Sequence, residues 1–184
     1  MLGTLKTSAI VIAVLIAGVL LLAAARPSTF RVERAASIEA PPEKVFALIN
    51  DFSRWDAWSP WEKKDPAMKR TFGATTAGKG ATYAWDGNRN VGQGSMEIID
   101  SITPRKLALK LDFAKPFEAH NIVVFTLEPK GGATNVRWVM EGAVPYFAKI
   151  IHLFSDMDSM VGKDFEAGLA SMKAIAEKYA ADPR

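Results

Sequence analysis

An uninterrupted apolar run near the N-terminus is the feature that most constrains this chain. The run extends from Thr7 to Ala25 without a charged residue and is bounded by Lys6 and Arg26. As a helix it would be about 28 Å long, close to the ~30 Å hydrocarbon core of a bilayer. A helix also satisfies its own backbone polar groups, as lipid requires. We therefore expect residues 1–26 to form a single-pass membrane anchor and residues 27–184 to form the folded domain.

A cleaved signal peptide is the alternative for the same segment. Ala23, Ala24 and Ala25 are small residues of the kind that precede a cleavage site. The run is longer than an ordinary signal-peptide core, and Arg26 and Pro27 follow it at once, so an uncleaved anchor is favoured. Basic residues on both flanks, with a small excess after the run, do not decide which side of the membrane holds the domain. A chain without cysteine is compatible with either side.

Composition argues against a nucleic-acid-binding role for the rest of the chain. The formal net charge of the whole sequence is only +3. Its densest basic stretch, residues 62–70, interleaves four basic with two acidic residues, which is typical of a solvated surface. The length after the anchor is that of one domain with a single core.

Hydrophobic periodicity predicts an α+β order of elements. Residues 29–38 alternate as a strand, Pro41 and Pro42 then precede a short helix over 43–50, and a further turn covers 52–58. Six more strands are expected, joined by short loops: 69–72, 81–85, 93–102, 106–113, 120–127 and 134–141. Because short connections require antiparallel neighbours, these strands should form a meander.

The C-terminal segment changes to helical periodicity after Pro145. A short helix is expected over 146–154, followed by a long amphipathic helix that Ser155 would cap. The apolar stripe of this helix and the apolar face of the meander would cover one another. Within the strand 106–113, Leu109 should face the helix and Lys110 the solvent.

Three segments resemble a known family. They are SIEAPPEKVFALINDFSRWDAWSPW (Ser37–Trp61), FEAHNIVVFTLEP (Phe117–Pro129) and DMDSMVGKDFEAGLASMK (Asp156–Lys173). The chain resembles the SRPBCC superfamily, also called START-like or Bet v 1-like, and within it the bacterial polyketide cyclase/dehydrase and lipid transport branch. The resemblance implies a helix-grip fold, in which a curved antiparallel sheet of about six or seven strands wraps a long C-terminal helix. It also implies an enclosed apolar cavity that holds a hydrophobic ligand.

The candidate residues for lining such a cavity are aromatic and large aliphatic side chains of the predicted sheet and helices. Trp55, Trp58 and Trp61 recur every three residues, and they either form an aromatic wall at the cavity mouth or pack the short helices onto the sheet. The residues assigned to the lining are Trp58, Trp61, Tyr83, Trp85, Leu109, Leu111, Phe125, Trp138, Met160 and Phe165.

No pattern in the sequence indicates a catalytic, metal or cofactor site. His120 and His152 are too far apart for a recognisable metal spacing. The glycine pairs at 78–80 and 92–94 are not followed by a helix, so they lack the context of a dinucleotide loop. Glu97 and Glu141 alternate with apolar neighbours and should face solvent. We therefore assign no catalytic residue, no metal and no cofactor, and a binding protein is favoured over an enzyme without deciding between them.

The sequence thus predicts a membrane-tethered domain that binds a lipid or other hydrophobic small molecule in an enclosed cavity. The membrane contact would run through residues 7–25, and no nucleic-acid partner is expected. Two alternatives stay open. A cyclase or dehydratase-type enzyme would need a buried titratable group in the cavity, and a partner-binding regulator would need an exposed apolar patch.

Overall fold

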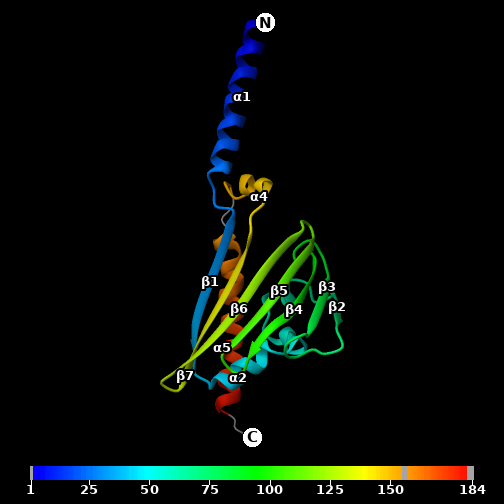
Figure 1. Ribbon diagram of the computed structural model, residues 1–184, viewed down its shortest axis with the longest axis vertical. Coiled ribbons are helices and arrows are strands. Elements are labelled where there is room, and N and C mark those ends of the chain that lie inside the picture. The colour runs from blue at the N-terminus through cyan, green and yellow to red at the C-terminus, as the bar shows by residue number, and fades with distance from the viewer. Residues whose placement is uncertain (1, 155–156, 182–184) are drawn as a thin grey trace.

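The computed structural model describes residues 2–154 and 157–181, and it is an α+β fold with one antiparallel sheet (Figure 1). The strands of the described chain are β1 (Thr29–Ile38), β2 (Lys69–Phe72), β3 (Thr82–Asp86), β4 (Gln93–Ile102), β5 (Lys106–Lys115), β6 (Ala119–Lys130) and β7 (Ala133–Ala143). The helices are α1 (Leu2–Ala24), α2 (Pro42–Ile49), the 3-10 helix η1 (Phe52–Ala57), α3 (Pro60–Lys64), α4 (Tyr146–Ile151) and α5 (Met157–Ala181).

The sheet confirms the predicted meander and shows in addition that the first strand pairs with the last. Strands β2 to β7 lie side by side in chain order, and β1 pairs antiparallel with β7 to give the order β1-β7-β6-β5-β4-β3-β2. The β1–β7 register runs from Thr29 opposite Ala143 to Ile38 opposite Thr134. The first strand of the domain therefore sits beside the last one, which brings the start of β1 next to the end of β7.

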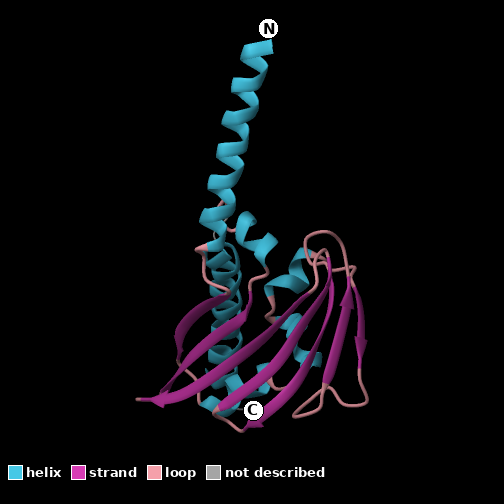
Figure 2. Ribbon diagram, turned by 45° about the horizontal axis from the view of Figure 1, so that its top comes forward, coloured by secondary structure: helices cyan, strands magenta, loops and turns pink. Residues whose placement is uncertain are grey.

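Helix α5 covers the concave face of the curved sheet, and the core lies between them (Figure 2). It packs against β1, α2 and α3. Leu109 is fully buried on this face and Lys110 is exposed on the other, as the alternation of β5 predicts. The arrangement matches the helix-grip architecture that the resemblance implied.

One local element was not predicted from the sequence, and one predicted helix cap cannot be compared with the structure. Helix α3 was not predicted, and it begins at Pro60, whose fixed φ suits the first helical position. Ser155, the predicted cap of α5, lies outside the described residues.

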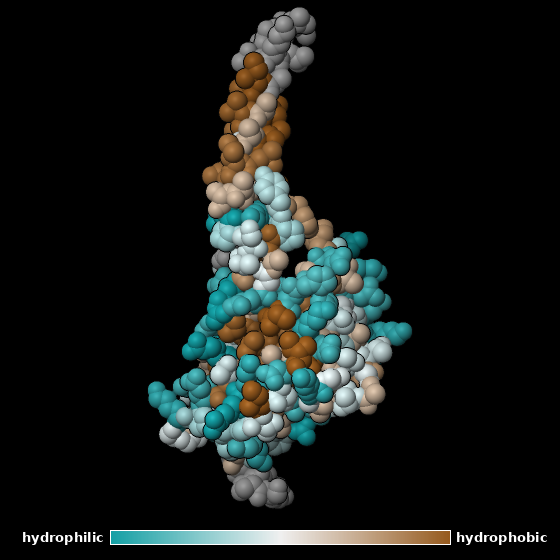
Figure 3. All heavy atoms as spheres, viewed as in Figure 1, coloured by the Kyte–Doolittle hydropathy of each residue, from teal (hydrophilic) through white to brown (hydrophobic). Residues whose placement is uncertain are grey.

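Helix α1 extends away from the domain and presents apolar side chains to its surroundings (Figure 3). The exposed large apolar residues run from Ile10 to Leu22; the side chains of residues 1–7 and 9 lie outside the described set. Among the described residues, no helix has both the length and the apolarity needed to cross a bilayer. The transmembrane anchor therefore stays a prediction.

Candidate functional site

Five of the ten predicted lining residues meet in one aromatic cluster between the sheet and α5. Trp138 of β7 stacks on Phe165 of α5, with ring centroids 4.0 Å apart. The Trp138 ring also lies 4.8 Å from that of Phe125 and 5.5 Å from that of Trp58. Trp61 touches both Trp138 and Phe165. Five residues, from β6, β7, α3, α5 and the turn after η1, thus form one group of packed rings.

The space around this aromatic cluster is filled by side chains. Trp58 and Trp138 are buried, with 0% and 2% of their surfaces exposed. Helix α5 approaches so closely at Gly168 that a Cβ there would lie 2.8 Å from Trp138 Cζ3. This end of the interior is therefore a packed core in which even an added methyl group would collide.

Two tryptophans of this region have a structural task at the end of α2. The indole Nε1 of Trp55 donates to the carbonyl of Ile49 at 3.0 Å, and that of Trp58 donates to the carbonyl of Leu48 at 2.9 Å. The last carbonyls of a helix have no partner within the helix, so these two indoles satisfy groups that burial would otherwise leave unpaired. This geometry favours packing over an aromatic wall for Trp55 and Trp58.

The remaining predicted lining residues divide into three groups. Tyr83 and Trp85 stack on each other in β3, at 6.1 Å, and are buried. Leu109 is fully buried and Leu111 is half-buried on the same face of β5. The placement of Met160 requires a correction, because 63% of its surface is exposed and it faces away from the core.

The position of Met160 follows from helix geometry. The buried stripe of α5 contains Phe165, Leu169 and Met172, spaced by three and four residues. Val161, partly buried, continues that stripe toward the N-terminus of the helix. Met160 precedes Val161 by one residue and is therefore rotated by about 100° from the stripe.

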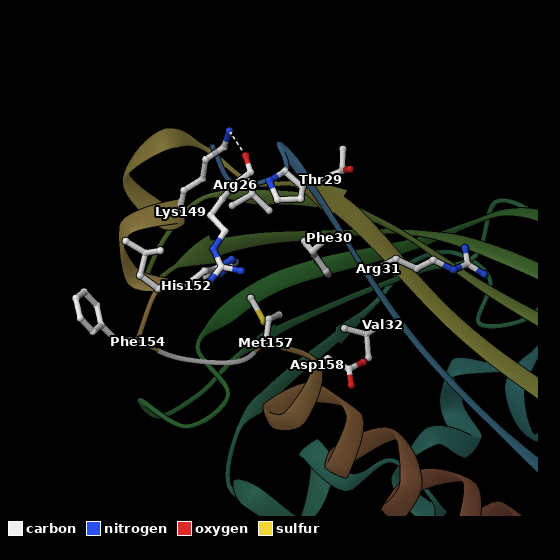
Figure 4. Close-up of a pocket in the computed structure, with 13 residues that line it drawn as sticks. Arg26, Thr29, Phe30, Arg31, Val32, Lys149, His152, Phe154, Met157 and Asp158 are labelled. Atoms are coloured by element: carbon white, nitrogen blue, oxygen red, sulfur yellow. Dashed lines mark hydrogen bonds between the residues drawn. The ribbon is translucent and has the colours of Figure 1, made fainter. Parts of the chain in front are cut away.

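The structure shows an open pocket elsewhere, at the end of the domain nearest α1, with a volume of about 580 Å³ (Figure 4). It lies between the start of β1, the end of β7, α4 with its following turn, and the start of α5. Its lining residues are Arg26, Pro27, Thr29, Phe30, Arg31, Val32, Val144, Lys149, His152, Leu153, Phe154, Met157 and Asp158. None of the ten predicted lining residues is among them.

The lining mixes apolar and charged side chains. Phe30, Val32, Val144, Leu153 and Met157 supply apolar surface from four different segments. In Figure 4 the side chain of Arg26 extends toward His152 on the α4 side of the pocket. An elongated molecule with an apolar body and one polar end would find both kinds of surface here.

The other charged groups of the pocket are engaged by the protein itself. The buried Lys149 donates from Nζ to the carbonyl of Arg26 at 2.9 Å and to Ser28 Oγ at 3.0 Å. Asp158 accepts two hydrogen bonds of 2.9 Å from the Arg34 guanidinium, which lowers the pKa of its carboxyl. Arg31 is paired with Glu33 and Glu141. These contacts hold the walls of the pocket, and none of them resembles a poised acid or base.

Sequence periodicity could not have identified this pocket. Its residues come from the start of β1, the end of β7, α4 and the start of α5. Spacing within each segment does not predict which of these segments meet. The one available signal was the change of period at Pro145, which marks the short helix α4 that forms one wall.

Two further polar clusters lie away from the pocket. Glu62 is buried, accepts from Tyr83 Oη at 2.9 Å and pairs with Arg70; burial, followed by the Glu62 carboxylate, raises the pKa of Tyr83. On the surface, the His120 ring lies 2.7 Å from Asp112, a contact that raises the pKa of His120. Within the described residues, no group of acidic, histidine or cysteine side chains could hold a metal ion.

Comparison with solved structures supports the fold assignment. A protein of Chromobacterium violaceum is 16% identical, with 83% of this chain and 99% of that one covered and a TM-score of 0.57. A protein of Nitrosospira multiformis is 15% identical, with coverages of 83% and 100% and a TM-score of 0.60. The Aha1 dimer of Colwellia psychrerythraea is 16% identical, with coverages of 80% and 96% and a TM-score of 0.57. At these identities the likeness concerns the fold alone.

Comparison of the sequence with protein families gives a match that covers most of the domain. No curated protein matches the chain. The family described as polyketide cyclase / dehydrase and lipid transport matches residues 29–177, from the first strand to the last turns of α5. This chain therefore belongs to the polyketide cyclase / dehydrase and lipid transport family.

Proposed function

We propose that this protein is a membrane-tethered domain that binds a lipid or another hydrophobic small molecule, and that the ligand occupies the pocket beside α4. The single observation that carries the proposal is the position of this pocket at the foot of the apolar helix α1. Family membership supports a hydrophobic ligand, and the pocket supplies a place for it.

The dimensions and lining of the pocket favour a small amphiphile. A volume of about 580 Å³ falls within the range of ordinary small-molecule sites, which is roughly 300–1,000 Å³. Apolar side chains of β1, β7 and α5 would contact the body of the ligand, while Arg26 and His152 lie where a polar end could reach them. The packed rings around Trp138 leave no comparable space there.

The tether is supported by the sequence of α1. The charge-free run from Thr7 to Ala25 has about the length of a bilayer core when helical. Its end leads directly through Arg26 and Pro27 into β1, so the pocket would be held close to the membrane surface. A ligand could then pass between the bilayer and the domain over a short distance.

A photo-crosslinking experiment tests the ligand site. The full chain in lipid vesicles is incubated with a diazirine-bearing fatty acid, irradiated and digested, and the label on residues 27–32 is measured. We expect Met157→Trp to lower this label about tenfold by filling the pocket, which corresponds to roughly 1.4 kcal/mol. Met160→Trp, on the exposed side of the same helix, is the matched control and should leave the label unchanged.

A third variant separates the pocket from the sheet interior. Leu109→Trp should destabilise the fold by about 1–3 kcal/mol, because the ring would enter a filled core. If Leu109→Trp instead left stability intact and removed the label, the ligand would lie between the sheet and α5. If no label above the vesicle background reached residues 27–32, and native mass spectrometry found no co-purifying molecule, the ligand proposal would be wrong.

One observation favours a second candidate, a partner-binding regulator. On the outer face of the sheet, Val124 lies between Ala108 and Val139 of the adjacent strands. Ala108 and Val139 are only 6% and 7% exposed, so the accessible apolar surface here comes mainly from Val124 and from Ile122, which is 43% exposed. Ile122 extends this row, and Figure 3 shows apolar atoms gathered on the same face. Ile122→Asp tests this candidate: loss of a stably co-purifying protein, with fatty-acid labelling unchanged, would support it.

A further inference from the structure

A group of exposed, mainly aromatic residues on and near α4 lies beside the foot of α1 and does not belong to the core. Phe117 of the β5–β6 turn is 60% exposed, and Phe154 after α4 is 80% exposed. Three residues of α4, Tyr146, Phe147 and Ile151, are each about half-exposed. These five residues, four aromatic and one aliphatic, are called the aromatic rim.

The aromatic rim brings together residues that are distant in sequence. The rings of Phe117 and Phe147 are 5.9 Å apart, which joins the β5–β6 turn to α4. Single exposed apolar side chains are common on protein surfaces, but a cluster of large ones generally marks a contact site.

Two hydrogen bonds fix α4 beside the base of α1. Tyr146 Oη donates to the carbonyl of Leu20 at 2.7 Å, and Lys149 Nζ donates to the carbonyl of Arg26. The helices α1 and α4 also pack together (Figure 1). The exposed apolar surface of α1, which includes Leu21 and Leu22, therefore continues onto the rim.

We propose that the aromatic rim is a second membrane contact, which lies at the boundary between lipid headgroups and acyl chains while α1 spans the bilayer. The proposal rests on the tether proposed above, since α1 would hold the rim within a few ångströms of the surface. Phenylalanine and tyrosine next to basic residues are typical of such interfaces. Arg26, two residues after the end of α1, and Lys115, two residues before Phe117, supply the basic groups.

A lipid surface fits this position better than a protein partner does. The rim shares its end of the molecule with the apolar helix, so any occupant must lie beside that helix as well. A bilayer crossed by α1 meets this requirement without a further component, because the same apolar phase continues from one surface to the other.

The contact has a consequence for ligand exchange. Phe154 belongs both to the rim and to the lining of the pocket beside α4. Seating the rim in the headgroup region would therefore turn the pocket mouth toward the bilayer. The ligand could then leave the membrane without crossing bulk water.

Site-directed labelling tests the proposal, because the chain contains no cysteine. Phe147→Cys and Phe154→Cys would each carry a nitrobenzoxadiazole label, in the full chain reconstituted in phosphatidylcholine–phosphatidylglycerol vesicles. Lys130→Cys, at the exposed end of β6 and the far end of the sheet, is the matched control. Quenching by lipids with shallow doxyl groups is measured alongside flotation of the vesicles.

We expect labels at residues 147 and 154 to be quenched about threefold more strongly than the label at 130, as side chains at the interface would be. A chain that floats with the vesicles while all three labels report water would overturn the rim contact and leave the tether standing. A chain that does not float would overturn both. Labels shielded from water but not quenched by doxyl lipids would identify a protein occupant, such as a second copy, and would also overturn the proposal.

Discussion

Residue by residue, the tryptophans differ in what their indole N–H groups do. Trp58 donates to the carbonyl of Leu48 at the end of α2. Trp138 is equally buried, but its Nε1 has no hydrogen-bond partner among the described residues. Both side chains lie in the same aromatic cluster, with their rings 5.5 Å apart. The two residues therefore allow the hydrogen bond to be separated from the packing of the ring.

This difference gives a matched pair of substitutions. Trp58→Phe and Trp138→Phe remove the same atoms from the core, but only Trp58→Phe leaves a buried carbonyl unpaired. We expect Trp58→Phe to lower the free energy of unfolding by about 1–3 kcal/mol more than Trp138→Phe does. Urea unfolding of both variants measures the difference, and equal losses would show that the indole bond to Leu48 contributes nothing.

Among the elements, α5 is held to β1 by charge as well as by packing. Arg34 of β1 bonds Asp158 and Glu166 of α5. The guanidinium lowers the pKa of Asp158 below its usual value, so the folded state favours the carboxylate. The contribution of Asp158 to stability is therefore present above the pKa of the unfolded state, about 3.9, and is lost as the pH falls through the lower folded pKa.

The corresponding prediction concerns the pH dependence of Asp158→Asn. At pH 6 the variant should unfold at a lower temperature than the wild type, because it cannot carry the charge that Arg34 binds. As the pH falls below the folded pKa of Asp158, the wild type loses the same charge and the two melting temperatures should converge. Calorimetry from pH 6 downward through the acid range measures this, and a difference that stays constant over the whole range would mean that the ion pair is not the cause.

For the whole molecule, the apolar helix α1 that precedes the domain predicts association with membranes. We expect the full chain to stay in the membrane pellet through an alkaline carbonate wash. Leu15→Lys places a charge at the middle of α1 and should weaken insertion, since lysine costs about 2.5–3.5 kcal/mol there. Immunoblots of pellet and wash measure both. Full-length wild type recovered in the wash would contradict the anchor, and a mature N-terminus at Arg26 would indicate a signal peptide.

The sequence by itself determined the elements and the faces they bury. Strand alternation placed Leu109 inside and Lys110 outside, and the helical stripe identified Phe165 as a core residue. These predictions hold because side-chain direction along a strand or helix is a local property of the backbone. Met160 shows how precisely the buried stripe of a helix must be assigned. It lies one residue from Val161 of that stripe, and its side chain is on the surface.

Only the tertiary structure decided which buried surfaces are packed and which enclose space. Trp138 and Phe165 belong to elements far apart in sequence, and their stacking fills the region where the sequence predicted a cavity. The pocket formed instead where the start of β1, the end of β7 and α4 meet, which follows from the pairing of the first strand with the last. Whether a space is filled depends on contacts between distant segments, and local periodicity carries no information about those contacts.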